Sequence, residues 1–311
     1  MASTVFSNSS KPMAPTVPQS PLLYLPTEIR LMIYELLLLP QNQSVAAKTT
    51  SAASDYYEYE RSAPAMTTDS GPMLLSVRTI DPLHYAQRRP NHCSTRYKIR
   101  CDRFRARCMD TTYHLLSNPG LHTAILRTNR RIHAEAAELL YSNCTFDFDT
   151  HIEAIVPFFS DLTPFARSCV KGMRVVKRAL PYEKEFDRCE WSAAFAYLAN
   201  NVCLRTLSLG VVAGKPGPQG WEGVVGYSKH DFRTVQEQDD MQWIQEIVNV
   251  RSVKAIDVKG VIEHCPPPMS MAMARYIKFS ASVDVGFGEF LKEEMESFIE
   301  MMAPLQRSIF Q

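Results

Sequence analysis

The second half of the chain alternates apolar segments of strand length with segments of helical periodicity. The strand candidates span residues 170–176, 204–212 and 253–258, and helical patterns lie at about 151–160, 187–201 and 239–249. Strands separated by helices pair in parallel through right-handed crossovers. The pattern therefore predicts that residues 151–311 form an α/β region of strand–helix units. An amphipathic pattern over 288–302 predicts that this region ends in a helix.

The three strand candidates also share the spacing L-x-x-L-x-L of a leucine-rich repeat. The matching residues are Val170, Met173 and Val175; Leu204, Leu207 and Leu209; and Val253, Ile256 and Val258. The Asn or Cys that follows in such repeats is absent, because Arg178, Val212 and Val261 stand there, and the repeat length is irregular. A degenerate leucine-rich-repeat-like sheet and ordinary strand–helix units both fit this pattern.

The first half of the chain carries two strong helical patterns. The first covers residues 22–39, where Thr27 is a candidate capping residue and Pro40 a helix breaker. The second covers residues 121–141 and is followed by a half-buried strand pattern at 145–148. Each helix has an apolar stripe that is too wide to leave in water, so we predict that the two helices pack against each other and against the strand–helix units. The fold class predicted is α+β.

The remaining segments of the first half lack an apolar period. Residues 1–20 are expected to be a disordered tail, and residues 41–71, rich in Ser, Ala and Thr, a mobile loop. Residues 72–120 are mixed and basic. We therefore predict a helical region at 21–150 that contains an inserted loop at 41–120.

Composition excludes several classes of protein. Lys and Arg total 34 against 33 Asp and Glu, so the formal net charge of +1 gives no global field for nucleic acid or an anionic membrane. No apolar run is long enough for a secretory signal or a membrane span. The eight cysteines are accordingly expected to be reduced thiols, and the protein to be soluble and cytoplasmic or nuclear, without membrane contact.

The two helical patterns carry a motif in a defined order. Residues 25–37 read LPTEIRLMIYELL, and residues 125–143 read ILRTNRRIHAEAAELLYSN, followed by Thr145 and Phe146. The first block resembles the start of an F-box, and the second resembles the next block of F-box-like proteins that are abundant in filamentous fungi. Residues 38–124 separate the two blocks, whereas a typical F-box is continuous.

The resemblance implies a function in protein interaction. In an F-box, the Leu-Pro turn and the apolar face of the first helix contact the adaptor subunit of a cullin-based ubiquitin ligase. Carried over to this chain, the contacts fall on Leu25, Pro26, Ile29, Ile33, Leu36 and Leu37. The protein would then be a substrate receptor whose α/β region recognises an unknown protein target. The alternative is a structural or interaction protein in which the helices are only core and the ligase link is lost.

No pattern of catalysis or metal binding is complete. Gly210 to Lys215 resembles a phosphate loop but has one residue too few between its glycines, and Pro216 stands where a hydroxyl is needed. Cys93, Cys101 and Cys108 lack the C-x-x-C spacing of a zinc knuckle, even with His114 nearby. We therefore expect a non-catalytic protein without a cofactor or a structural metal.

One local basic patch lies between residues 88 and 107. Its members are Arg88, Arg89, Arg96, Lys98, Arg100, Arg103, Arg105 and Arg107. A nucleic-acid surface would need more aromatic side chains and a wider basic field. A solvated face or a docking site for an acidic protein is the favoured interpretation, and a nucleic-acid-associated factor is the third alternative.

Overall fold

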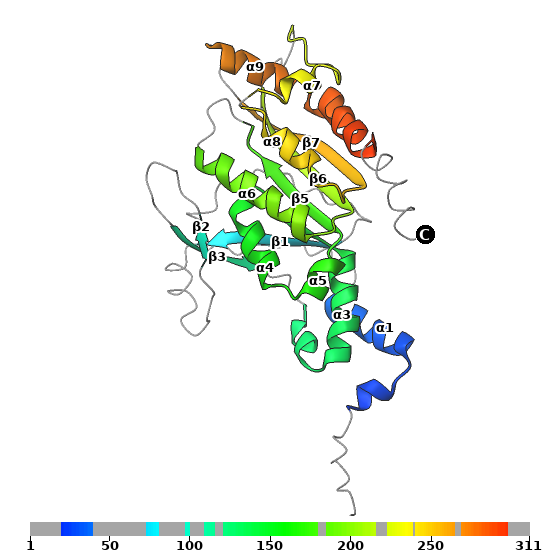
Figure 1. Cartoon of the computed structure of the whole chain (residues 1–311). Coiled ribbons are helices and arrows are strands. Elements are labelled where there is room, and N and C mark those ends of the chain that lie inside the picture. The colour runs from blue at the N-terminus through cyan, green and yellow to red at the C-terminus, as the bar shows by residue number, and fades with distance from the viewer. Residues whose placement is uncertain are drawn as a thin grey trace, which may run out of the picture.

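The computed structural model describes nine parts of the chain. They are residues 20–39, 73–80, 97–99, 109–115, 121–179, 185–215, 223–238, 240–264 and 269–297. Their centre is a seven-stranded sheet of strand order β2-β3-β1-β4-β5-β6-β7 (Figure 1). The sheet and the helices around it form an α+β fold, as the sequence predicts.

Five neighbouring strands of the sheet run parallel. They are β1 (Met73–Ile80), β4 (Cys144–Asp147), β5 (Gly172–Lys177), β6 (Thr206–Lys215) and β7 (Ala255–His264). At the β1 side, β3 (Met109–Leu115) and β2 (Tyr97–Ile99) continue the sheet in antiparallel pairing. The predicted strands at 145–148, 170–176, 204–212 and 253–258 are therefore confirmed, together with their parallel pairing.

The three predicted repeat strands lie in register with one another. Met173 pairs with Leu207, which pairs with Ile256, and all three side chains are buried. From β4 to β7 the order of the strands follows the order of the chain. Both a leucine-rich-repeat arc and ordinary strand–helix units have this order, so the repeat interpretation stays a prediction.

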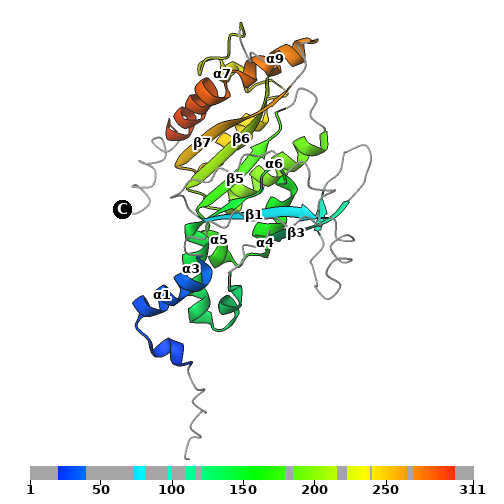
Figure 2. The same cartoon turned by 180° about the vertical axis from the view of Figure 1, so that it is seen from behind.

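The helices that connect the parallel strands cover one face of the sheet. They are α4 (Ile155–Asp161), α5 (Pro164–Cys169), α6 (Glu185–Asn201), α7 (Phe232–Val235) and α8 (Trp243–Val248). Helices α4, α6 and α8 lie in front of the strands in Figure 1, and the strands are seen from the opposite face in Figure 2. Parallel strands added in one direction through right-handed crossovers place their helices on one side, which explains this single layer.

Aromatic side chains fill the space between these helices and the sheet. Trp191 of α6 stacks on Phe195 with ring centroids 4.3 Å apart and meets Trp243 of α8 edge-on at 6.1 Å. Trp243 in turn contacts Phe279, near the end of α9 (Met271–Ser280), and Phe287 of the π-helical turn η5 (Val283–Phe287). One continuous core thus joins the helices to the sheet.

The structure corrects the expectation of an inserted loop at 41–120. Within that range, residues 73–80, 97–99 and 109–115 are strands of the central sheet. Strand β1 alternates buried Leu75 and Val77 with polar neighbours, and its Arg78 forms a buried ion pair with Asp147 of β4 (Nη2 to Oδ2, 2.8 Å). The basic residues of this segment obscured the strand pattern, because a buried arginine reads as a surface residue in the sequence.

The predicted helix at 121–141 is interrupted. The 3-10 helix η3 (Thr123–Arg127) comes first, and α3 (Arg130–Asn143) begins after Asn129. Asn129 has an extended backbone, and its side-chain oxygen accepts a hydrogen bond from the Arg131 N–H at 2.8 Å. An asparagine in that role caps a new helix instead of continuing the previous one.

Several predictions fall wholly or partly outside the described residues. They are the predictions for the tail at 1–20 (apart from residue 20), the loop at 41–71, the three cysteines considered for zinc and the arginines of the basic patch. The final helix is described as far as residue 297, with Phe290 and Met295 buried as its pattern predicts. The boundary predicted near residue 150 separates β4 from β5, which are neighbours in one sheet.

Candidate partner-binding site on helix α1

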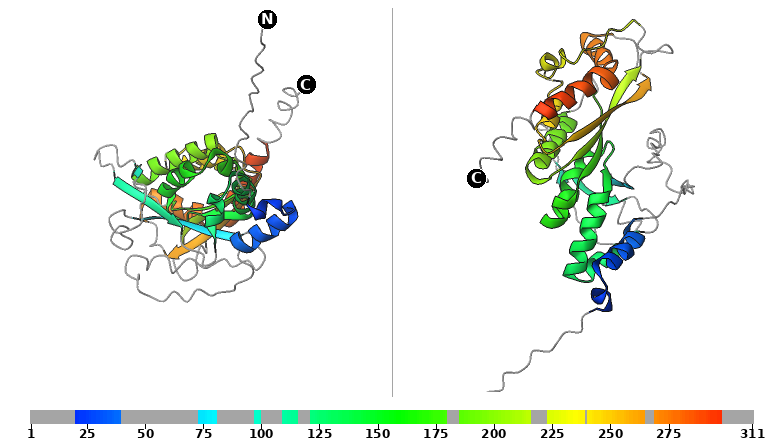
Figure 3. Two further views of the ribbon diagram at one scale, coloured as in Figure 1. Left: turned by 90° about the horizontal axis from the view of Figure 1, so that it is seen from below. Right: turned by 90° about the vertical axis from the view of Figure 1, so that its right-hand side faces the viewer.

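Helix α1 (Thr27–Leu38) follows the short 3-10 helix η1 (Pro21–Tyr24) and packs on α3 (Figure 3). Its last turn is also tied to the segment before η3, because the His122 N–H donates to the Leu37 carbonyl at 3.0 Å. The two blocks of the sequence motif therefore meet in space, which confirms that prediction.

The buried face of α1 combines polar and apolar residues. Its fully buried residues are Arg30, Tyr34 and Leu38, which recur at helical spacing, and Leu31 and Leu37 pack half-buried against the core. Among the other apolar residues of the helix, Ile29, Met32 and Leu36 are exposed, whereas Ile33 is half-buried. Arg30 and Tyr34 are buried because they have a specific polar partner on α3.

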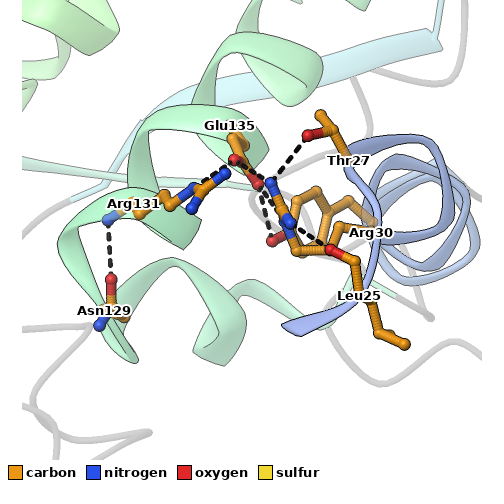
Figure 4. Close-up of polar contacts among 7 residues, drawn as sticks. Leu25, Thr27, Arg30, Asn129, Arg131 and Glu135 are labelled. Carbon is orange, nitrogen blue, oxygen red and sulfur yellow. Dashed lines mark hydrogen bonds and ion pairs between the residues drawn. The ribbon is translucent and has the colours of Figure 1, made fainter. Parts of the chain in front are cut away.

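That partner is Glu135, which lies opposite Arg30 in the middle of α3 (Figure 4). The Arg30 guanidinium donates from Nη2 to Oε1 of Glu135 at 2.6 Å and from Nε to Oε2 at 2.8 Å. The Tyr34 hydroxyl donates to the same carboxylate at 3.2 Å, and Arg131 on the exposed side of α3 donates at 3.1 Å. A two-point arginine–carboxylate contact fixes both distance and angle between the helices.

The charges of this cluster stabilise one another. The hydrogen bonds from Arg30 hold the pKa of the Glu135 carboxyl at about 2, well below its ordinary value of 4.5, although burial acts in the opposite direction. Glu135 raises the pKa of Arg30 in return. The pKa of the Tyr34 hydroxyl is raised, first by burial and then by the nearby carboxylate. The cluster is therefore a closed ion pair at neutral pH and offers no group that titrates there.

Arg30 also holds the Leu-Pro turn that precedes the helix. Its Nη1 donates to the Leu25 carbonyl at 2.5 Å, and its Nη2 donates to the Thr27 hydroxyl at 3.0 Å. The predicted capping role of Thr27 is thus wrong, because the cap position is Pro26 and the Thr27 oxygen accepts from Arg30 instead. With its carbonyl fixed, Leu25 directs its side chain away from the polar cluster (Figure 4).

The opposite face of α1 exposes a row of large apolar side chains. Leu25, Ile29, Met32 and Leu36, called the α1 stripe below, are 37%, 43%, 58% and 62% exposed. The spacing of Ile29, Met32 and Leu36 places these three along one side of α1, and Leu25 lies in the turn just before the helix. Scattered exposed apolar residues are ordinary, but a continuous row on one helix is typical of an interaction site.

The residues predicted as adaptor contacts divide into two groups. Leu25, Pro26, Ile29 and Leu36 are exposed, whereas Ile33 and Leu37 are half-buried. Met32 is a further exposed residue outside the predicted contact set, and Arg30, Tyr34 and Glu135 had no predicted role. None of these last three lies on the apolar stripe of its helix, so the local pattern gave no signal for them.

Polar clusters elsewhere in the described residues connect structural elements. The Thr79 hydroxyl at the end of β1 lies 2.6 Å from His151 Nδ1 and 2.8 Å from Glu153 Oε1, which joins β1 to the turn η4 (Ile152–Ala154). Among the residues that the structure describes, no group of three or more His, Cys, Asp or Glu side chains could hold a metal ion. No described helix is long and apolar enough to cross a membrane.

The fold and this site define an α+β protein with a predominantly parallel sheet and a helical pair at its N-terminal side. The chain belongs to the family described as "Domain of unknown function (DUF7730)", which matches residues 16–224. The match includes α1, α3 and the strands β1 to β6. No curated protein and no solved structure matches the chain.

Proposed function

We propose that this protein is a non-catalytic interaction protein whose α1 stripe binds the adaptor subunit of a cullin-based ubiquitin ligase. The observation that carries the proposal is the orientation of α1. A helix with an F-box-like sequence packs on its own fold by Arg30, Tyr34 and Leu38 and leaves Ile29, Met32 and Leu36 in contact with solvent. The α/β region would then be available for a protein target.

The exposed area is suited to a partner contact. Complete burial of a leucine, isoleucine or methionine side chain stabilises a complex by about 1.5–3 kcal/mol relative to full exposure. The four residues of the α1 stripe are between 37% and 62% exposed. Burial of each side chain against a partner would therefore contribute a substantial part of that free energy. A few such anchors in one row are enough to dominate an interface.

The contact between the two motif blocks supports the same proposal. Arg30 comes from the first block and Glu135 from the second, and residues 38–124 lie between the blocks in the sequence. The pair joins α1 and α3, which are distant in the sequence, into one helical unit. An inserted segment that includes strand β1 is therefore compatible with an F-box-like unit, because the insertion leaves the two helices in contact.

Co-purification with the adaptor tests the proposal. The full chain should retain purified adaptor, and the double variant Leu25→Ala/Pro26→Ala should lose it, as should Met32→Ala/Leu36→Ala. Val285→Ala is the matched control, because Val285 is 65% exposed and lies in η5 at the other end of the fold. The triple variant Arg103→Ala/Arg105→Ala/Arg107→Ala should also bind normally. A folded wild-type protein that shows no adaptor binding by calorimetry at micromolar concentrations would refute the ligase link.

The second candidate is a structural or interaction protein that keeps this fold but has lost the ligase link. It would have the same exposed row, so the adaptor experiment separates the two. The third candidate, a nucleic-acid-associated factor, depends on the basic patch between residues 88 and 107. It predicts salt-dependent retention of the protein on a polyanion column, which the arginine triple variant would abolish.

A further inference from the structure

Helix α1 buries a charged residue within a partly apolar contact face. The buried side carries Arg30, Tyr34 and Leu38, with Leu31 and Leu37 packed against the core beside them, and the exposed side carries Ile29, Met32 and Leu36. Apolar residues thus occur on both sides of the helix, so the hydrophobic effect alone does not distinguish a rotation that buries Arg30 from one that exposes it. A directional interaction that satisfies the buried guanidinium does distinguish the two.

The Arg30–Glu135 pair has the geometry to do so. Each residue of an α-helix is turned by about 100° from the previous one, so a rotation that brings Ile29 or Met32 inward carries Arg30 away from α3. That rotation would break both guanidinium bonds to Glu135, and also the Tyr34 bond to the same carboxylate. Glu135 would be left half-buried and facing apolar side chains, which is unfavourable for a carboxylate.

The two ends of α1 are held differently. The C-terminal end is anchored by buried Leu38 and by the backbone bond from His122 to Leu37. The N-terminal end is held by Arg30, which bonds to Glu135 and to the Leu25 carbonyl. Loss of the ion pair therefore acts first on the N-terminal turns, where Leu25, Ile29 and Met32 lie.

We infer that Arg30 and Glu135 are positioning residues that set the rotation of α1 and so present the α1 stripe to a partner. The inference rests on the proposed function for the identity of the partner, but not for the orientation itself. Buried polar pairs that select one packing arrangement at some cost in stability are known from helical assemblies. Arg131 does not share this role, because it is exposed and joins Glu135 within the same helix.

Oxidation of native methionines measures the orientation without any partner. Methionine oxidation by dilute hydrogen peroxide follows the exposure of the thioether. Met32 is 58% exposed, Met271 is 76% exposed and serves as the exposed reference, and Met173 is 1% exposed and serves as the buried one. Peptide mass spectrometry gives the three rates in one sample of the full chain.

The variant Glu135→Leu removes the carboxylate and leaves the Arg30 guanidinium buried without it. A buried unpaired charge is unfavourable, so we expect α1 to turn until Arg30 reaches solvent, Met32 oxidation to slow several-fold relative to Met271, and adaptor binding to weaken in parallel. Glu135→Gln retains an acceptor for Arg30, and Arg131→Ala retains the pair, so both should oxidise Met32 at the wild-type rate. Unchanged Met32 oxidation in a folded Glu135→Leu variant would overturn the inference.

The reversed pair Arg30→Glu/Glu135→Arg covers the case in which the Glu135→Leu variant fails to fold. It restores opposite charges at the same two positions, and Met32 oxidation should remain near the wild-type rate. A reversed pair that folds but protects Met32 would overturn the inference. A wild-type protein that fails to bind adaptor, yet shows the expected methionine rates, would refute the proposed function and leave the inference standing.

Discussion

The parallel strands and helix α1 use similar apolar patterns in opposite ways. In β5, β6 and β7, the pattern residues Met173, Leu207 and Ile256 are buried under the helical layer. In α1, the pattern residues Ile29, Met32 and Leu36 remain exposed, and Arg30 and Tyr34 are buried with Leu38 on the other side of the helix. An apolar period thus shows which residues can be buried, but not whether the chain itself or another molecule covers them.

The strands should show the largest response to truncation. Leu209 in β6 is completely buried, so Leu209→Ala should lower the free energy of unfolding by about 2–5 kcal/mol through lost contacts and a cavity. Urea unfolding followed by circular dichroism measures the change. A loss below about 1 kcal/mol would mean that the core relaxes around the site, contrary to a close-packed sheet.

The ion pair of the sheet should rank next. Asp147→Ala leaves the Arg78 guanidinium buried without its carboxylate, and removal of one partner from a buried pair typically costs about 3 kcal/mol or more. The same urea titration applies, with Asp257→Ala as the control because Asp257 is exposed on β7. Equal effects of the two substitutions would show that the Arg78–Asp147 contact contributes nothing specific.

The ion pair of α1 should give a smaller effect that depends on pH. The pKa of Glu135 is lower in the folded protein than its ordinary value, so its contribution is present in full above about pH 4.5 and is lost as the pH falls toward 2. Glu135→Gln cannot titrate. The difference in unfolding free energy between wild type and Glu135→Gln should therefore be constant from pH 5 to 8 and shrink below about pH 4.5. A difference that varies between pH 6 and 8 would contradict this assignment.

The α1 stripe should give the smallest effect on stability. Leu36 is 62% exposed, so Leu36→Ala should change the free energy of unfolding by no more than about 0.5 kcal/mol. The same variant should weaken adaptor binding measured by calorimetry. A large loss of stability would show that Leu36 packs within the fold, and would remove the contrast between α1 and the strands.

Sequence reasoning located most of the sheet but not all of it. The strands β4 to β7 were predictable because Phe146, Val175 and Leu209 belong to apolar segments bounded by turns or helices. Strand β1 was missed because Arg78 interrupts its apolar pattern, and its ion pair with Asp147 on β4 helps to make a buried arginine acceptable. Such a partner on a distant strand is invisible in a local pattern.

The same limit applies to the candidate site. The residues Leu25, Pro26, Ile29 and Leu36 were predictable from the motif, and they are exposed. The way they become exposed was not predictable, because it depends on Arg30 meeting Glu135 across a long stretch of sequence. Periodicity gives the faces of a helix, and only the three-dimensional pairing decides which face turns inward.

Site-specific photo-crosslinking tests the central claim most directly. A photoreactive amino acid placed at Met32, 58% exposed in the α1 stripe, is compared with one at Val285, 65% exposed in η5, after mixing with purified adaptor. The account predicts a crosslink to the adaptor from position 32 and none from position 285. Crosslinks from position 285 alone, from both positions equally, or from neither would contradict the claim that α1 presents its apolar face to this partner.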